Sequence, residues 1–225
     1  MRPGPRRSLT HAEILDVAFD LLEAKGFAAV SVRGVASGLG LTPTALYTYY
    51  PSKNALLRGM VEQLLARLDQ DADTPTVASA AGARARLLSL ALRLRELLTG
   101  HAGALGLIMS GPLDGPNAMR LNETLLESFM AAGLALDDAA RAAYALQVYV
   151  LGSIALESAD LDLEADAAAS ADRPLMTDAA GTALWTDLAT FPLSEQTAAV
   201  VAQHNSTAQF TWGVERLLDG LVGVR

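Results

Sequence analysis

Cysteine is absent from this 225-residue chain, and aromatic residues and long uncharged runs are scarce. Without cysteine there is no disulfide framework, no thiolate nucleophile and no zinc–cysteine site. Aromatic residues make up only 5% of the chain while alanine and leucine dominate, which favours helices over a β-sandwich. The uncharged run over residues 97–113 is shorter than a membrane span and is interrupted by glycine and proline. We therefore expect no membrane segment.

Signals for export and for catalysis are missing as well. Residues 1–7 are basic, but polar and charged residues follow where a signal peptide needs its apolar stretch, so we expect a soluble cytoplasmic protein. The sequence has no Gly-x-Ser-x-Gly elbow, no P-loop and no His-Glu-x-x-His motif. The pair Gly38 and Gly40 lacks a preceding strand and a third glycine, so it is no dinucleotide fingerprint. We expect no enzyme, no metal site and no cofactor.

Charge is unevenly distributed along the chain. The net charge is −8, which taken alone argues against a nucleic-acid binder. Residues 1–60, however, contain seven Lys+Arg against four Asp+Glu, a net of +3. The remainder has 17 − 7 = 10 basic and 25 − 4 = 21 acidic residues, a net of −11. This asymmetry is typical of a small DNA-binding domain on an acidic body, although a merely solvated basic face is an alternative.

Local capping signals predict four helices in the basic region. Thr10 and Glu13 form a capping-box pattern before a helix that ends at Lys25-Gly26. Short helices follow over 32–37, capped by Ser31, and over 43–49, begun by Thr42-Pro43. Ser52 caps a fourth helix from residue 53 to about 70. Two short helices joined by a glycine turn have the geometry of a helix-turn-helix, whose second helix enters the major groove.

The second short helix has more polar surface than packing requires. Leu41, Ala45 and Leu46 tether it, which leaves two tyrosines and three threonines near its exposed face, suited to phosphates and base edges. Arg33 could contact a guanine edge or a phosphate. Lys53 could bind a phosphate together with the N-terminal amides of its own helix. The alternative for both is an ordinary surface residue. Tyr50 and Phe27 are expected to pack rather than touch DNA. The predicted DNA-binding residues are Arg33, Thr42, Thr44, Tyr47, Thr48, Tyr49 and Lys53.

The remaining sequence predicts further helices and no strands. Breaks at glycine and proline separate helices over about 81–99, 101–110, 117–132 and 137–158, and two more follow over about 194–204 and 207–222. Residues 71–79 and 160–182 are predicted to be loops, the second rich in alanine and aspartate without apolar periodicity. The expected fold class is all-α, with a helix-turn-helix domain over 1–53, a connecting helix over 53–70 and a ligand-binding and dimerisation domain over 71–225.

The N-terminal pattern resembles the tetracycline-repressor (TetR) family. The resemblance rests on residues 18–27, on Val32-Arg33-Gly34-Val35-Ala36, on Leu39-Gly40-Leu41 and on the spaced pattern of 46–57. It implies that the predicted DNA-binding residues occupy the family's usual contact positions. Residues 122–125, 133–139, 151–157 and 210–221 resemble, more weakly, the drug-sensing domain of the tetracycline repressor itself.

In such proteins two long helices of each subunit form a four-helix dimer bundle, here implied for 137–158 and 207–222. The expected interface residues are Leu151, Phe210, Val214, Leu217 and Leu221, although the same apolar face could pack only within its own subunit. The family's magnesium–tetracycline site needs a histidine, which residues 107–112 lack. A metal–tetracycline ligand is therefore not expected.

An apolar cavity with sparse polar groups is the expected sensing site. Asn122 and Gln147 stand out because a buried amide in an apolar helix needs a partner, which a ligand could supply. Each candidate alone could equally be core. The predicted ligand-binding residues are Leu64, Ser89, Leu92, Arg93, Leu105, Ile108, Met109, Leu121, Asn122, Leu125, Phe129 and Gln147.

The sequence thus predicts a homodimeric, ligand-responsive DNA-binding regulator. Its partners would be a palindromic operator and a small, largely apolar effector that releases a repressor from DNA. A transcriptional activator of the same fold, or a helical dimer that binds no DNA, are the alternatives.

Overall fold

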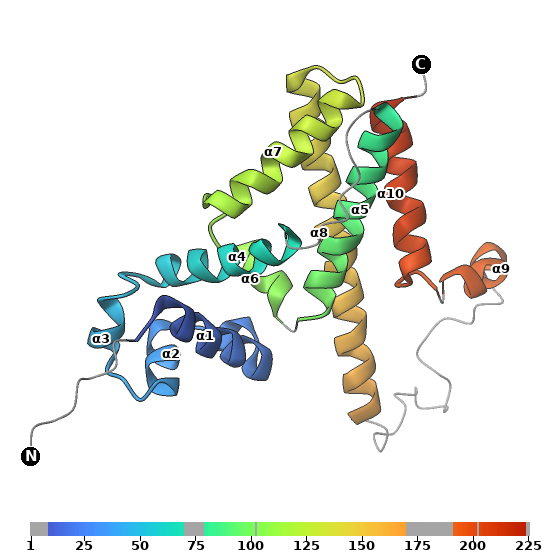
Figure 1. Ribbon diagram of the computed structural model, residues 1–225. Coiled ribbons are helices and arrows are strands. Elements are labelled where there is room, and N and C mark those ends of the chain that lie inside the picture. Colours follow the sequence, from blue (N-terminus) through green and yellow to red (C-terminus); the bar gives the residue numbers. More distant parts are fainter. Residues whose placement is uncertain (1–8, 70–78, 102, 170–190, 202, 224–225) are drawn as a thin grey trace, which may run out of the picture.

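Helices are the only regular secondary structure among the described residues, as the composition predicts. The computed structural model describes residues 9–69, 79–101, 103–169, 191–201 and 203–223. These residues form ten α-helices and one short 3₁₀ helix, with no strand among them (Figure 1). The expectation of an all-α fold is confirmed.

The N-terminal helices form a small unit, the head, at one end of the molecule (Figure 1). Its elements are α1 (His11–Lys25), η1 (Phe27–Ala29), α2 (Val32–Gly38) and α3 (Pro43–Tyr47). The capping box at Thr10 is present, with the Glu13 backbone N–H donating to Thr10 Oγ1 at 3.2 Å and the Thr10 N–H donating to the Glu13 carboxylate at 2.8 Å. Ser31 and Thr42 cap α2 and α3 as predicted. Local sequence signals therefore determine where these helices begin.

A longer helix, α4 (Lys53–Asp69), leads from the head into the rest of the molecule (Figure 1). It packs on α1 and also on three helices of the C-terminal part, the body. Within the body α5, α7, α8 and α10 pack together. The body helices are α5 (Ala80–Thr99), α6 (Ala104–Ser110), α7 (Pro116–Ala131), α8 (Leu136–Ala169), α9 (Pro192–Val201) and α10 (Thr207–Val222).

Several helix boundaries differ from the prediction: the helix expected over 101–110 begins only at Ala104, and the one expected over 194–204 ends at Val201. The helix expected over 43–49 ends at Tyr47, and Thr48 and Tyr49 form a turn, because Pro51 has no N–H to continue the helix and disfavours helical backbone in the residue before it. The loop expected over 160–182 is wrong for its first part, since α8 continues to Ala169. Alanine and leucine have high helix propensity, which outweighs the missing apolar periodicity there. Residues 71–78 and 170–182 of the two expected loops lie outside the described residues.

The head is seated on the body through a close backbone approach. Gly103 has a φ of +77°, and a Cβ there would lie 2.7 Å from Leu22 of α1; a Cβ on Gly106 of α6 would lie 3.1 Å from Cβ of Phe27. Phe27 therefore packs against α6, as expected for a residue that does not touch DNA. Beside it, His101 lies 3.0 Å from the Glu23 carboxylate of α1 and 2.9 Å from Arg67 of α4.

Arginines of α5 hold α10 in place. Arg84 pairs with Asp219 of α10 at 2.7 Å, and Arg95 pairs with Glu157 of α8 at 2.8 Å. The Arg95 guanidinium also donates to the Asn205 carbonyl just before α10 and lies over the Phe210 ring at 5.4 Å. The Arg95–Glu157 side chains are only 13% and 16% exposed, so this pair joins three helices in the interior of the body.

The stretch of α8 over Leu136–Ala159 is long and apolar enough to cross a membrane by those two criteria alone. Its mean hydropathy is 1.3, and 33% of its most apolar stretch is buried in the subunit. One side of α8 packs on α5, α7 and α10. On its other side Tyr144, Val148 and Leu156 are exposed.

Candidate nucleic-acid interface and ligand cavity

A tight turn fixes α3 against α2. Gly40 has a φ of +65°, in the left-handed region that favours glycine, and the Leu41 N–H donates to the Ala36 carbonyl at 2.8 Å. Leu46 of α3 is fully buried against Val35 and Ala36 of α2, within the core. The buried face of α3 is thus used up by packing on α2, and its other face is directed to solvent.

The residues expected to contact DNA lie on three consecutive elements: α2, α3 and the start of α4. Tyr47 is a large aromatic side chain left 48% exposed, which packing does not explain. Tyr49 is half-buried, in an edge-on contact with His11 at 5.8 Å between ring centroids. Exposed members of the set are Arg33, Thr42, Thr44, Tyr47, Thr48 and Lys53.

The threonine hydroxyls of this surface differ in what they can still donate. The Thr42 Oγ1 accepts from the Ala45 N–H at 3.3 Å, so its own proton remains available for a phosphate oxygen. The Thr48 hydroxyl donates its proton to the Ala45 carbonyl, so it can only accept. Thr42 is therefore suited to a phosphate, whereas Thr48 is suited to a base or amide donor or to a methyl contact.

The start of α4 presents a lysine beside free helix-end amides. Ser52 caps the helix, its Oγ accepting from the Ala55 N–H at 3.1 Å, and Lys53 is the first helical residue and is exposed. The helix N-terminus and the ammonium group both attract anions. Tyr50, expected to pack under this helix, is 7% exposed, and a Cβ on Gly59 would lie 3.1 Å from its ring. That expectation is confirmed.

His11 joins this surface although the sequence did not single it out. Its ring lies 5.8 Å from Tyr49 and 5.2 Å from Tyr50, and it is exposed at the start of α1. The only sequence signal is its place directly after the Thr10 cap, beside the basic residues 1–7.

A small cavity of about 60 Å³ lies between α4, α5 and α7; we call it the α4–α5–α7 cavity. Two arginines and two neutral polar residues share its wall with leucines. The lining residues are Leu65, Leu68, Arg86, Leu90, Arg93, Asn117, Leu121 and Thr124.

Two of the twelve expected ligand-binding residues, Arg93 and Leu121, line this cavity. Met109 is 63% exposed on α6, so it is on the outside of the body. Asn122 and Gln147 are half-buried, and neither amide is among the buried side-chain polar atoms without a hydrogen-bond partner. The residues buried in the core are Leu64, Ile108, Leu125 and Phe129, and those half-buried outside this cavity are Ser89, Leu92, Leu105, Asn122 and Gln147.

Arg86 is the lining residue that sequence reasoning missed. Arg86, Leu90 and Arg93 follow one another at i, i+4 and i+7, so they share one face of α5. The sequence contains this spacing, which places Arg86 on the same helix face as Arg93. The α4 and α7 walls of the cavity, in contrast, depend on tertiary packing.

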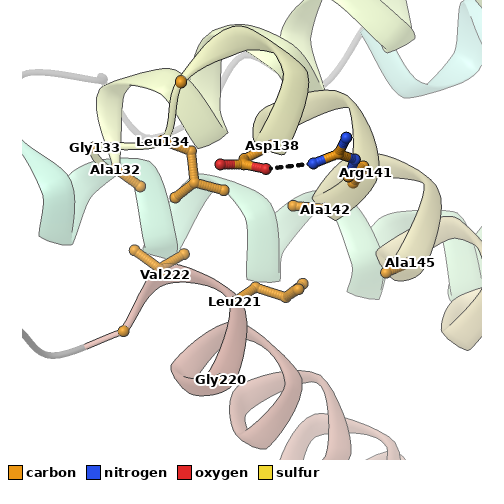
Figure 2. Close-up of a pocket in the computed structure, with 12 residues that line it drawn as sticks. Ala132, Gly133, Leu134, Asp138, Arg141, Ala142, Ala145, Gly220, Leu221 and Val222 are labelled. Carbon is orange, nitrogen blue, oxygen red and sulfur yellow. Dashed lines mark hydrogen bonds and ion pairs between the residues drawn. The ribbon is translucent and has the colours of Figure 1, made fainter.

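A larger open groove of about 950 Å³ lies at the far end of the body. Figure 2 shows Leu221 and Val222 at the end of α10 facing Ala132 and Leu134 of the α7–α8 turn. Asp138 and Arg141 form an ion pair at its rim, 2.9 Å apart. The groove is therefore apolar within and charged at one edge.

Exposed apolar side chains follow one another along α8 and α10, which contact each other. On α8 the exposed residues recur every four positions, and Tyr144 and Leu156 are each 69% exposed. Trp212 of α10 is 58% exposed. We call this surface the α8/α10 face; it consists of Tyr144, Val148, Gly152 and Leu156 of α8 and Ala208, Trp212, Arg216 and Gly220 of α10.

The expected dimer residues only partly belong to an exposed surface. Leu151, Leu217 and Leu221 are half-buried. Phe210 is 4% exposed and Val214 fully buried, so their side chains have no surface to offer a partner. They lie on the face of α10 that packs within the subunit, where the Phe210 ring is 6.0 Å from that of Tyr149. Their part of the apolar stripe thus covers the subunit's own core.

Comparisons with known proteins agree on one family for both parts of the chain. Residues 14–60 match the family model for bacterial regulatory proteins of the tetR family, and residues 78–224 match that for the tetracyclin repressor-like C-terminal domain.

Among curated relatives, an HTH-type transcriptional regulator of Saccharopolyspora erythraea is 29% identical over 150 residues, covering 67% of this chain and 61% of that protein. The chain thus spans less than two thirds of that relative. The HTH-type transcriptional repressor DrrR1 of Streptomyces coeruleorubidus is 27% identical over 97% of this chain and 79% of its own length. A crystal structure described as a possible TetR family transcriptional regulator from Streptomyces coelicolor A3(2) superposes with a TM-score of 0.75 at 26% identity, covering 96% of this chain and 100% of that one.

Proposed function

Because the chain belongs to the TetR family, we propose that it is a homodimeric transcriptional repressor that a small effector releases from a palindromic operator. The observation that carries the proposal is the polar, exposed face of α3, flanked by Arg33 and Lys53. The printed name of one relative, a transcriptional repressor, supports repression over activation. Residues 1–53 would be the DNA-reading domain, 53–70 the connecting helix and 71–225 the sensing and dimerising domain of a cytoplasmic protein.

In the proposed complex α3 lies in the major groove and α2 crosses the backbone. Thr42 and Lys53 bind phosphates, while Thr44, Tyr47, Thr48 and Tyr49 contact bases or adjacent backbone. Arg33 reads a base edge. His11 orients Tyr49 from the side through their ring contact.

The α8/α10 face is the surface on which we propose that the second subunit packs. One head covers only a half-site, so a palindrome needs a two-fold dimer. Gly152, Ala208 and Gly220 lie exposed among the larger residues, which lets two helices approach closely. A second subunit would cover the apolar side of α8 that its own subunit leaves open.

Release would run through α4, which packs on α1 of the head and on α5, α6 and α7 of the body. An effector that widens the α4–α5–α7 cavity pushes on Leu65 and Leu68, near the end of α4. Tilting α4 moves the head and changes the separation of the two recognition helices. By linkage, the effector binds free protein more tightly than operator-bound protein by the factor with which it weakens DNA binding.

Operator binding is tested on the full chain with duplexes selected from a random pool. Lys53→Ala should weaken binding to all sequences alike and reduce the salt slope by about one, because one phosphate contact is lost. Arg33→Ala should cost ~1–3 kcal/mol mainly at one operator position. Lys25→Ala removes the same charge from the exposed last turn of α1 and is the matched control. If no duplex is enriched, the proposed function is wrong; equal losses on specific and random DNA for Arg33→Ala would make it a phosphate contact.

Dimerisation is tested by Val148→Asp, which places a charge in the middle of the α8/α10 face. We expect a monomer in analytical ultracentrifugation and loss of operator binding. Leu113→Asp, at a residue 51% exposed between α6 and α7, is the control for adding a charge to exposed apolar surface. A dimer that survives Val148→Asp at micromolar concentration contradicts the proposed interface.

A further inference from the structure

Four arginines of α5 divide into two pairs with different environments. Arg84 and Arg95 form ion pairs with Asp219 and Glu157, on the side of α5 that holds α10 and α8. Arg86 and Arg93 line the α4–α5–α7 cavity instead. Among the described residues, Arg86 takes part in no ion pair. Arg86 and Arg93 thus line a cavity on another side of α5 and do not attach α10 to it.

The cavity's lining favours an anion over other ligands. Among the described residues that line it there is no carboxylate, whereas two guanidinium groups, the Asn117 amide and the Thr124 hydroxyl are present. Arg86 Nε is buried and has no hydrogen-bond partner. A buried donor of a cationic group left without an acceptor is costly, and charge-assisted bonds to carboxylate or phosphate oxygens are the strongest bonds that a guanidinium forms. The buried Arg86 Nε is therefore a charged donor that still lacks an acceptor.

We propose that the effector of the α4–α5–α7 cavity carries an anionic oxygen group, a carboxylate or a phosphate, which Arg86 and Arg93 bind. This inference rests on the proposed function and names the chemical class of its effector. The apolar part of the molecule packs on Leu90 and Leu121. This effector differs from the largely apolar one that the sequence predicts, because only the folded structure brings Arg86 and Arg93 into one cavity.

Binding of the anion acts directly on α4. Arg93 Nη1 donates to the Leu68 carbonyl at 2.9 Å, in the last turn of α4, where a cation also stabilises the helix dipole. A carboxylate is a stronger acceptor for a guanidinium than a backbone carbonyl. An anion in the cavity therefore draws Arg93 from Leu68 and removes that hold on the end of α4.

The size of the cavity gives a second reason for movement. About 60 Å³ is smaller than the roughly 300–1,000 Å³ of typical small-molecule sites, so an effector has to widen it. Leu65 and Leu68 form the α4 wall, and Arg93 ties this wall to α5. Competition for Arg93 and widening of the cavity thus move the same end of the same helix.

The test uses probes built on one phenyl ring: benzoate with its isosteric neutral amide benzamide, phenyl phosphate, and the cation benzylamine, each titrated by calorimetry into the full-length protein. We expect saturable binding of at least one anion, and binding at least tenfold weaker for the amide and the amine. Arg86→Gln and Arg93→Gln should each weaken anion binding at least tenfold. Arg84→Gln removes the same charge from the other side of α5 and should change it less than twofold. The two anions distinguish a carboxylate from a phosphate site.

Three results overturn the inference: no saturable binding of either anion, equal or tighter binding of benzamide or benzylamine, or anion binding that survives both cavity substitutions. Circular dichroism of each variant shows whether it is folded. Arg86→Lys keeps the positive charge but loses the two parallel N–H donors of the guanidinium, so it should retain part of the affinity. Operator binding is measured separately. Anion binding without sequence-specific DNA binding contradicts the proposed function alone, and DNA binding without anion binding contradicts this inference alone.

Discussion

Glu62 of α4 caps the first turn of α7 from outside that helix, and its removal measures how firmly α4 is attached to the body. Its carboxylate accepts from the backbone N–H groups of Asn117 at 2.6 Å and Ala118 at 3.1 Å. The Asn117 side chain in turn donates to the Glu62 carbonyl at 2.9 Å. α7 has no capping side chain of its own, since Gly115 is its N-cap residue. Glu62 therefore supplies the cap.

The magnitude follows from these bonds. Hydrogen bonds to a charged group contribute ~1.5–3 kcal/mol and a helix cap ~1 kcal/mol, and Glu62 is half-buried, which moderates both. We expect Glu62→Ala to lower the free energy of unfolding by about 2 kcal/mol. For a chain of this size that corresponds to a fall in Tm of roughly 4–8 °C. Glu62→Gln keeps one acceptor and should lose about half as much.

The assay is urea denaturation at constant protein concentration, because a dimer's stability depends on concentration. Gly115→Ala is a second route to the same loss, since a Cβ there would lie 2.4 Å from the Glu62 carboxylate and displace it. Glu123→Ala, on the exposed surface of α7, is the control and should stay within about 0.5 kcal/mol of wild type. A Glu62→Ala effect no larger than that of the control would refute the reasoning.

Three further expectations can be checked with the same denaturation assay. Gly213→Ala should destabilise the protein by ~1–2 kcal/mol, because its Cβ would overlap the Tyr149 hydroxyl of α8 and overpacking outweighs the helix propensity gained; an unchanged midpoint would contradict this packing. Burial raises the pKa of the Tyr50 hydroxyl above its ordinary value of 10.0, so as the pH rises this hydroxyl ionises first in the unfolded chain. Wild type should therefore lose stability between pH 10 and the raised pKa. Tyr50→Phe should lack that loss. The hydrogen bond and charge of Arg58 hold the pKa of Asp114 below 3.8. The small contribution of this pair to the free energy of unfolding is therefore present above pH 3.8 and disappears as the pH falls through the lowered pKa. Asp114→Asn and wild type should differ in stability at pH 7 and have the same stability in strong acid.

The head was predictable from sequence because its signals are local. The caps at Thr10, Ser31, Thr42 and Ser52 each bond to a backbone N–H three residues on, so each motif specifies its own helix start. The polar face of α3 followed from the same periodicity. What the sequence could not show was which surface an apolar or charged stripe meets.

The body illustrates that limit in two places. Phe210 and Val214 form a regular apolar stripe, but periodicity cannot tell whether the stripe packs on the subunit's own α8 or on a partner. Arg86 and Arg93 share one face of α5, but only tertiary packing makes that face the wall of a cavity rather than open surface. Long side chains are especially hard to place, since a guanidinium reaches several positions from the same backbone.

The junction of head and body, described through Leu22, Phe27 and the backbone at Gly103 and Gly106, has a consequence for how the protein can change. The head's principal contacts with the body run through α1, η1 and α4, whereas α2 and α3 pack mainly on one another and on α1. If the proposed function holds, substitutions on the outer face of α3 therefore alter the DNA sequence that is read without disturbing the body. Conversely, the cavity walls of α5 and α7 can be remodelled for another effector without changing the reading surface. The head and the body can therefore vary independently of each other. A chimera of two such proteins joined within α4 should keep the operator of the parent that supplies the head and the effector of the parent that supplies the body.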